Sequence, residues 1–159
     1  MSGEFRIREA SFRDIEATFH VRANTRENAI PRERLASLGI TPGSVEAAIK
    51  GGSYRSWVCD IDGKVVGFCN VEGSTGEVIV LAVLSGYEGR GIGRVLLSEA
   101  VQFLRAAGNA RIWLTASPLE SFRSHGFYRA NGWKPTGIMG AYGDEELEYV
   151  VPGRSFGAA

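Results

Sequence analysis

Three glycines at alternate positions, Gly89, Gly91 and Gly93, stand between two very different stretches of sequence. Before them, residues 78–84 form an apolar run that is typical of a buried strand. After them, residues 94–107 repeat apolar side chains at near-helical spacing. The pattern predicts a strand, a glycine turn and a helix. Because the first N–H groups of a helix lack partners and glycines let a ligand approach the backbone, such a turn suits a phosphate or pyrophosphate.

Two common phosphate-binding patterns do not fit this turn. The dinucleotide pattern G-x-G-x-x-G needs a third glycine, but Arg94 and Leu96 stand at the two positions where it could fall. The mononucleotide loop needs a Gly-Lys-Ser/Thr triplet, which the turn lacks. Taken alone, the stretch also fits a glycine-rich turn that binds nothing.

Residues 83–93 resemble motif A of the GNAT superfamily of acyl-CoA N-acyltransferases. The core of that motif is Gln/Arg-x-x-Gly-x-Gly/Ala, and residues 88–93 match it with Glu88 as a departure at the first position. A carboxylate there should weaken pyrophosphate binding if it faces the ligand, and should matter little if only its backbone N–H is used. The resemblance implies that acetyl-CoA is held by Glu88, Gly89, Arg90, Gly91, Ile92, Gly93 and Arg94.

Residues 121–133 resemble motif B of the same superfamily. The Phe127-Tyr128 pair fits the pattern, while Ser121 and Ser124 replace the usual Asn and Ala. The resemblance implies that Tyr128 donates a proton to the departing sulfur and that Ser121 is the cofactor-contacting position. The alternative for Tyr128 is a tyrosine that packs at a helix edge.

The remaining sequence predicts the elements of the GNAT fold. Alternation of apolar and polar residues predicts a strand at residues 5–9, and β-forming residues predict strands at 54–61 and 64–72. Further strands are expected at residues 77–83, 111–115, 134–140 and 145–151. Cap and stop residues predict three short helices between residues 11 and 51. Asp62-Gly63 predicts a hairpin, and the helix between the fourth and fifth strands requires them to run parallel.

The fold class is therefore α/β (α+β). The resemblance covers about residues 5–151 and implies a single mixed, mostly antiparallel sheet of about seven strands flanked by helices. In this fold the parallel fourth and fifth strands splay apart to receive the pantetheine arm. The backbone of Leu81, Ala82 and Val83 would face that arm. A bulge in the fourth strand would free one of their N–H groups for the oxyanion.

Composition agrees with one domain over residues 1–159. The 18 basic and 18 acidic side chains cancel, which gives no reason to expect a nucleic-acid or membrane partner. Cys59 and Cys69 lie in apolar runs without metal-ligand spacing, so we expect buried thiols and no metal. With no signal-peptide pattern and no long apolar stretch, the expected location is cytoplasmic.

The expected function is N-acetyl transfer from acetyl-CoA to an amine by direct attack in a ternary complex. The attacking amine must lose a proton, and Glu77 matches a position where some GNAT members place a catalytic glutamate. Other candidate bases are Glu120, His125 and Glu72. The alternative function is a CoA-binding sensor or structural module without turnover.

The sequence leaves the acceptor open, as a small-molecule amine or a protein or peptide amine. In this superfamily the acceptor walls come from the first helices and the last hairpin. Acidic residues in these segments would suit a cationic amine, or a solvated rim: Glu27, Asp144, Glu145 and Glu146. A homodimer is possible in this fold, because its C-terminal strands often pair between subunits.

Overall fold

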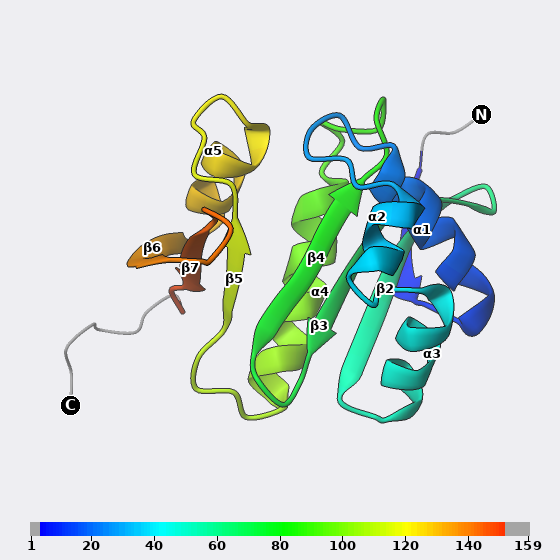
Figure 1. Cartoon of the computed structure of the whole chain (residues 1–159), viewed down its shortest axis with the longest axis horizontal. Helices are drawn as coiled ribbons and strands as arrows, with labels where there is room; N and C mark the ends of the chain where they lie inside the picture. The colour runs from blue at the N-terminus through cyan, green and yellow to red at the C-terminus, as the bar shows by residue number, and fades with distance from the viewer. Residues whose placement is uncertain (1–3, 152–159) are drawn as a thin grey trace.

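The computed structural model describes residues 4–151 of the 159-residue chain. These residues form a seven-stranded sheet with helices on both faces (Figure 1). The elements in chain order are β1 (Arg6–Glu9), the 3₁₀-helix η1 (Phe12–Asp14), α1 (Ile15–Ala23), α2 (Arg32–Ser37), α3 (Pro42–Lys50), β2 (Tyr54–Ile61), β3 (Lys64–Glu72), β4 (Glu77–Val83), α4 (Ile92–Ala106), β5 (Trp113–Ala116), α5 (Arg123–Ala130), β6 (Trp133–Met139) and β7 (Glu145–Tyr149). The last two residues predicted for the final strand, Val150 and Val151, follow β7 as coil.

The antiparallel half of the sheet follows the hairpin signals in the sequence. β2, β3 and β4 have the bounds that the sequence predicts and pair in antiparallel order. Asp62 and Gly63 both have positive φ, 51° and 84°, as a two-residue type I′ turn requires. The Asp60 carboxylate accepts a hydrogen bond from the Gly63 N–H at 2.7 Å and so stabilises the turn.

β4 and β5 are parallel neighbours that meet at their starts. Within residues 4–151 their register contains one pair, Glu77 with Trp113. The Trp113 N–H also donates to the Gly76 carbonyl at 3.1 Å. Beyond this point β5 pairs with β7, in the sheet order β1-β2-β3-β4-β5-β7-β6. The parallel pair and the separation of its carboxyl ends confirm the predicted sheet (Figure 1).

The irregularity in β4 lies earlier than the sequence predicts. Asn70 pairs with Val80 and Val71 with Val78, so Ile79 is the extra residue in β4. Residues 81–83 keep a regular register with β3, which corrects the bulge expected there. An extra residue is easily accommodated at Ile79, because that side chain is 41% exposed.

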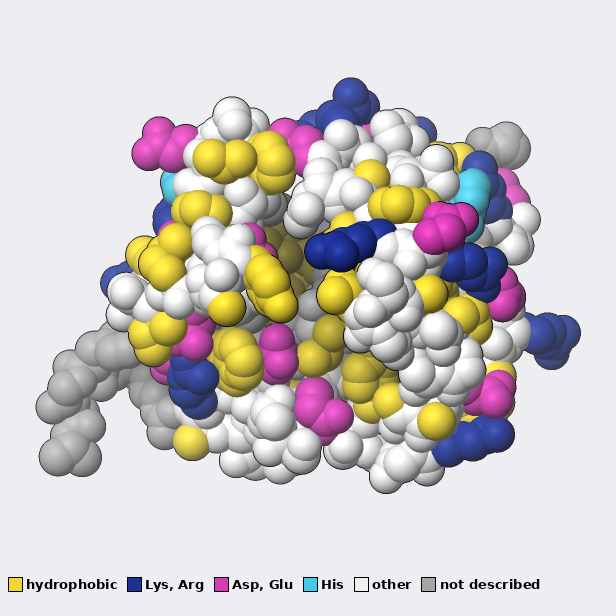
Figure 2. Space-filling model, viewed as in Figure 1, with side chains coloured by type: hydrophobic (Ala, Val, Ile, Leu, Met, Phe, Trp, Pro, Cys, Tyr) yellow, Lys and Arg dark blue, Asp and Glu magenta, His cyan; other side chains and the backbone are white. Residues whose placement is uncertain are grey.

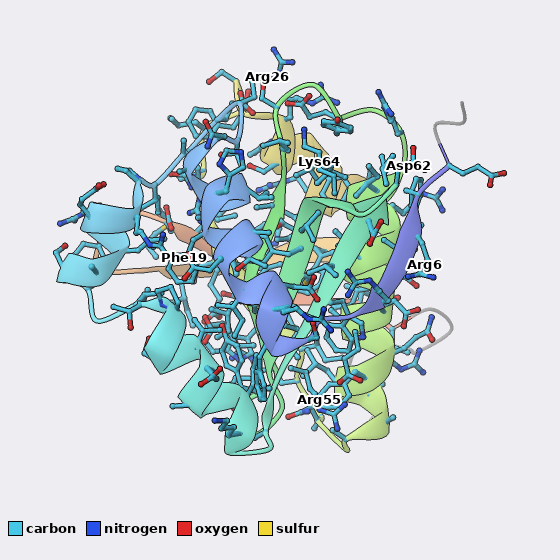
Figure 3. All side chains as sticks on the ribbon, turned by 90° about the vertical axis from the view of Figure 1, so that its right-hand side faces the viewer. Arg6, Phe19, Arg26, Arg55, Asp62 and Lys64 are labelled. Atoms are coloured by element: carbon cyan, nitrogen blue, oxygen red, sulfur yellow. The ribbon has the colours of Figure 1, made fainter. Side chains whose placement is uncertain are left out.

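α4 begins at Ile92, two residues before the predicted amphipathic segment. It covers one face of the sheet, while α1 and α3 cover the other (Figure 3). The residues it buries are Ile92, Leu96, Leu97, Ala100, Val101 and Leu104. Even this helix, the longest one described at 15 residues, is too short to cross a membrane, and none within residues 4–151 has the required length and apolarity.

The three short N-terminal helices build a second, smaller core on the α1 face of the sheet. α3 begins as predicted, with Thr41 as its cap: the Thr41 hydroxyl accepts a hydrogen bond from the Ser44 N–H at 3.1 Å. The chain leaves α2 at Gly39, whose φ of 82° suits glycine. The buried side chains of this core are Ile15, Phe19, Leu35 and Val45.

Candidate active site

A cleft of about 860 Å³ lies where β4 and β5 separate. Figure 2 shows it as a hollow with hydrophobic side chains in its depth, between the part of the molecule with α5 and the part with α1 to α3. Most of the residues that the sequence assigns to the site line it: Leu81, Ala82, Val83, Glu88, Gly89, Gly91, Ile92, Gly93, Arg94 and Tyr128. Of the described residues assigned to the site, Glu77, Arg90 and Ser121 do not.

The glycine loop has the geometry of an anion cradle. Gly89 and Gly91 have φ of 78° and 84°, a left-handed backbone that glycine adopts without strain. A Cβ at Gly89 would meet nothing within 4 Å, and one at Gly91 would meet only the Arg94 guanidinium at 3.5 Å. Gly91 caps α4, so the N–H groups of the first helical turn face this open space. The loop therefore fits a pyrophosphate group.

The Glu88 carboxylate is held by a residue that sequence reasoning missed. Arg26, in the loop between α1 and α2, donates to it from Nε at 2.9 Å and from Nη2 at 3.3 Å. The Gly86 N–H donates to the same carboxylate at 2.8 Å. The pKa of Glu88 is lowered to about 2, mainly by Arg26 and further by the backbone N–H groups of Glu88 and Gly86. The positive charge of Arg26 (labelled in Figure 3) thus offsets the unusual carboxylate of the loop.

The ion pair between Arg26 and Glu88 predicts that removal of the one partner and of the other changes CoA affinity in opposite directions. Arg26→Gln should weaken CoA binding, because it leaves the Glu88 charge uncompensated beside the cradle. Glu88→Gln should tighten CoA by less than about tenfold, because it frees Arg26 for the ligand. Both shifts should shrink at high salt, since exposed charges are screened. The double variant should return near the wild-type affinity in calorimetric titrations. A loss of affinity in Glu88→Gln would contradict this account.

The second half of β4 presents an open backbone edge to the cleft. The Leu84 N–H donates to the Val66 carbonyl of β3 at 2.8 Å. Because hydrogen-bonded pairs alternate in an antiparallel ladder, Ala82 also faces β3, and the N–H groups of Leu81 and Val83 point the other way. β5 diverges on that side, so the divergence of β5 rather than a bulge leaves these groups open.

Tyr128 is a buried residue whose side chain lines the cleft. The residue is 8% exposed and lies edge-on between the rings of Phe127 and Trp133, at centroid distances of 5.3 and 6.0 Å. Burial raises the pKa of Tyr128, and the nearby Arg22 opposes that shift. The hydroxyl therefore keeps its proton at neutral pH.

Glu77 lies at the closed end of the β4–β5 pair. It is half-buried, and its pKa is raised by burial and by the neighbouring Glu72. Glu72 itself accepts hydrogen bonds from the N–H and hydroxyl of Ser74 at 3.0 and 2.7 Å, and its pKa is lowered. Glu77 also lies close enough to influence the hydroxyl of Tyr54, whose pKa is about 12, mainly through burial.

The other candidate bases and the acidic residues are placed as follows. Of the described candidates, Glu72, Glu120 and His125 are not in the cleft lining, whereas Glu27 and Asp144 are. The Glu27 carboxylate accepts the Arg123 N–H at the start of α5, at 2.8 Å. The other two acidic residues predicted near the acceptor form ion pairs with arginines: Glu145 with Arg129, and Glu146 with Arg111.

Sequence comparison identifies the family. A sequence model of the Acetyltransferase (GNAT) family matches residues 13–133, which is most of the chain. The mycothiol acetyltransferase of Beutenbergia cavernae is 38% identical over 72 residues, which make up 45% of this chain and 24% of that protein. The match thus spans about a quarter of that relative's length.

Solved structures show the same fold. The PaiA N-acetyltransferase of Thermoplasma acidophilum, in complex with coenzyme A, has a TM-score of 0.78 at 20% identity and covers 93% of this chain and 99% of that one. The ribosomal-protein-S18-alanine N-acetyltransferase of Escherichia coli has a TM-score of 0.66 at 17% identity and covers 96% and 99%. The family match and the shared fold give one conclusion. The chain belongs to the GNAT family of acetyltransferases, whose acetyl donor is acetyl-CoA.

Proposed function

We propose that the protein is an N-acetyltransferase that moves the acetyl group of acetyl-CoA to an amine by direct attack in a ternary complex. The observation that carries the proposal is one cleft that contains the α4 N-terminus, the open edge of β4 and the Tyr128 side chain. The first suits a pyrophosphate, the second suits the amides of a pantetheine arm, and the third suits a departing thiolate.

The backbone performs the binding and orienting steps of this mechanism. Acetyl-CoA supplies the acetyl group as a thioester. The N–H groups of Ile92, Gly93 and Arg94 would hold its phosphates at the α4 N-terminus. The N–H groups of Leu81 and Val83 would align the arm, and one of them would stabilise negative charge on the carbonyl oxygen. Ser121 is exposed and outside the cleft lining, so its cofactor contact stays a prediction.

Two side chains divide the proton transfers. An aqueous amine at neutral pH is mostly protonated, so a base must take one proton before attack. Burial raises the pKa of Glu77, which makes its carboxylate a better proton acceptor. Because Glu77 stands outside the cleft lining, it would act through an intervening water. Tyr128, which keeps its proton, would deliver it to the sulfur.

Tyr128→Phe should lower turnover about a hundredfold, the lower end of the range for a general acid. The ring stays, so CoA affinity and thermal stability should change little. Turnover is measured as thiol release from acetyl-CoA. Tyr149→Phe is the matched control, because Tyr149 also packs against Trp133, at 5.5 Å, and is not in the cleft lining. Full activity of Tyr128→Phe across pH would make the tyrosine structural.

Glu77→Gln should change the pH dependence of turnover. The loss should be largest above the pKa of Glu77 and below that of the amine, where the carboxylate can accept a proton and the amine still needs a base, and should shrink as pH rises further and the amine deprotonates by itself. The raised pKa of Glu77 means that wild-type activity should rise at a higher pH than an ordinary carboxyl would give. A uniform loss at every pH would indicate that Glu77 has a packing role. No loss at any pH would indicate that the base is Glu120, His125 or Glu72 instead.

A CoA-binding module without turnover is the second candidate function. It is favoured by the position of Glu77 outside the cleft lining and by Glu88 in the loop. The experiment that separates the two is thiol release from acetyl-CoA with a panel of small amines and peptides. Binding of CoA with no thiol release above background across the panel would support the module.

The remaining partners are proposals as well. The acceptor would be a small-molecule amine or a protein or peptide amine. A homodimer is supported by the edge position of β6 and its exposed Ile138 and Met139, at 58% and 56%. Cytoplasmic location agrees with Cys59 and Cys69, which are buried free thiols.

A further inference from the structure

A second cavity of about 340 Å³ lies beside the cleft, on the sheet face that α1, α2 and α3 cover. Its volume is at the lower end of small-ligand sites, roughly 300–1,000 Å³. Its walls are mostly apolar side chains, among them Phe19, which Figure 3 labels on α1. Arg22, Ile79 and Val80 line both this cavity and the cleft. The two spaces therefore meet at the extra residue of β4.

Arg22 is a cation at this junction that lacks a matching anion. Its Nη1 donates to the Asn28 carbonyl at 2.6 Å, and no carboxylate within residues 4–151 forms an ion pair with it. Burial lowers the pKa of Arg22, which reflects the cost of holding the charge there. A partly buried guanidinium without a carboxylate is the natural partner of an anionic ligand.

Asn70 supplies a second unsatisfied group. Its Nδ2 donates to the Tyr54 hydroxyl at 3.0 Å, but its Oδ1 is buried without a hydrogen-bond partner among the described residues. The residue is 5% exposed, lines the cavity and pairs directly with Val80 at the junction. An unpaired buried acceptor is costly unless a ligand donates to it.

We propose that the acceptor is a free α-amino acid with an apolar side chain. This inference rests on the proposed function. The side chain fills the second cavity, the carboxylate binds Arg22, and the amine donates to Asn70 Oδ1 while its lone pair faces the cleft. Arg22 favours a free amino acid over a peptide N-terminus, because a peptide offers only a neutral carbonyl at that position.

The reaction then balances without another reagent. The amine nitrogen forms a C–N bond to the acetyl carbon, and the C–S bond breaks with its electron pair on sulfur. The protonated amine gives one proton to the base before attack and a second to solvent as the amide forms, while the sulfur gains one from the acid, so that one proton is released overall. The products are an N-acetyl amino acid and CoA.

The test compares acceptors that differ only in the carboxylate: L-leucine with L-leucinamide and 3-methylbutylamine, and likewise L-methionine and L-phenylalanine, each with its amide and its decarboxylated amine. We expect at least one of the three amino acids to exceed its carboxylate-free analogue roughly tenfold to a hundredfold in kcat/KM, as for one charged hydrogen bond. Glycine, which lacks a side chain, should be a poor acceptor. Equal or better rates for the analogues, or for the peptide Leu-Ala, would overturn the proposal.

Matched variants distinguish the carboxylate-binding role of Arg22 from a general loss of structure. Arg22→Met should bring the ratio of leucine to leucinamide rates near one, and Arg22→Lys should keep part of the preference. The control is Arg34→Met, an exposed arginine on α2 outside both cavity linings, which should keep the wild-type ratio. An unchanged ratio in folded Arg22→Met would overturn the proposal.

Direct binding measurements test the amino-acid ligand separately from the acetyltransferase activity. Calorimetry of the CoA-loaded protein should detect the preferred amino acid and show weaker binding of its amide. If no amine gives thiol release, the proposed function fails, and this binding difference still decides the ligand class. If amines turn over but none of the three amino acids binds, the proposed function stands and the amino-acid assignment fails.

Discussion

Gly91→Val should abolish measurable CoA binding. Gly91 caps α4 in a left-handed conformation, and the space around its missing Cβ holds only the Arg94 guanidinium, at 3.5 Å. The valine methyl groups would fill this space, where the pyrophosphate would approach the first N–H groups of the helix. A β-branched side chain at this φ also strains the backbone, so some stability should be lost, roughly 1–2 kcal/mol.

The opposite end of the same helix provides the control. Gly108 follows α4 with a φ of 89°, and a Cβ there would meet nothing within 4 Å. Gly108→Val should therefore lose a similar amount of stability and keep CoA affinity. The comparison needs thermal melts and calorimetric titrations of both variants. Undiminished affinity in Gly91→Val would remove the pyrophosphate from this loop.

Gly76→Ala should destabilise the protein by about 3 kcal/mol or more. Gly76 has a φ of 80°, and a Cβ there would lie 2.0 Å from the Arg111 carbonyl oxygen. The left-handed backbone alone costs about 1–2 kcal/mol, and the steric overlap adds to it because the obstacle is backbone. Relief requires the segment before β5 to move, which would break the hydrogen bond from the Trp113 N–H to the Gly76 carbonyl.

Gly63→Ala is the control for this position. Gly63 has nearly the same φ, 84°, but a Cβ there would meet nothing within 4 Å. It should lose only the 1–2 kcal/mol or so of backbone strain. Urea unfolding measures both values. Equal losses in the two variants would mean that the segment before β5 moves easily enough to accommodate a Cβ at Gly76.

Short-range signals were enough for most of the fold. Asp62 and Gly63 predicted a hairpin because their positive φ values match the twist of the flanking strands, and β2 and β3 have the predicted bounds. The glycines of residues 88–93 predicted the turn into α4 for a similar reason, because glycine adopts a left-handed backbone without steric strain. The parallel direction of β4 and β5 followed from the helix that connects them, whereas the position of β7 between β5 and β6 was not predicted.

The sequence by itself thus determined most of the elements, the pairing of strands that follow one another and the glycine turn, since these depend on neighbours along the chain, whereas the β1–β2 and β5–β7 pairs join distant segments. Only the tertiary structure decided which distant side chains meet. Arg26 reaches Glu88 across 62 positions, and Arg22, Asn70 and Val80 meet from α1, β3 and β4. Glu77 is kept out of the cleft lining because its strand meets β5 at that residue. The periodicity of the sequence cannot predict such contacts, because they depend on how loops and helices pack over the sheet. That packing depends on residues throughout the chain.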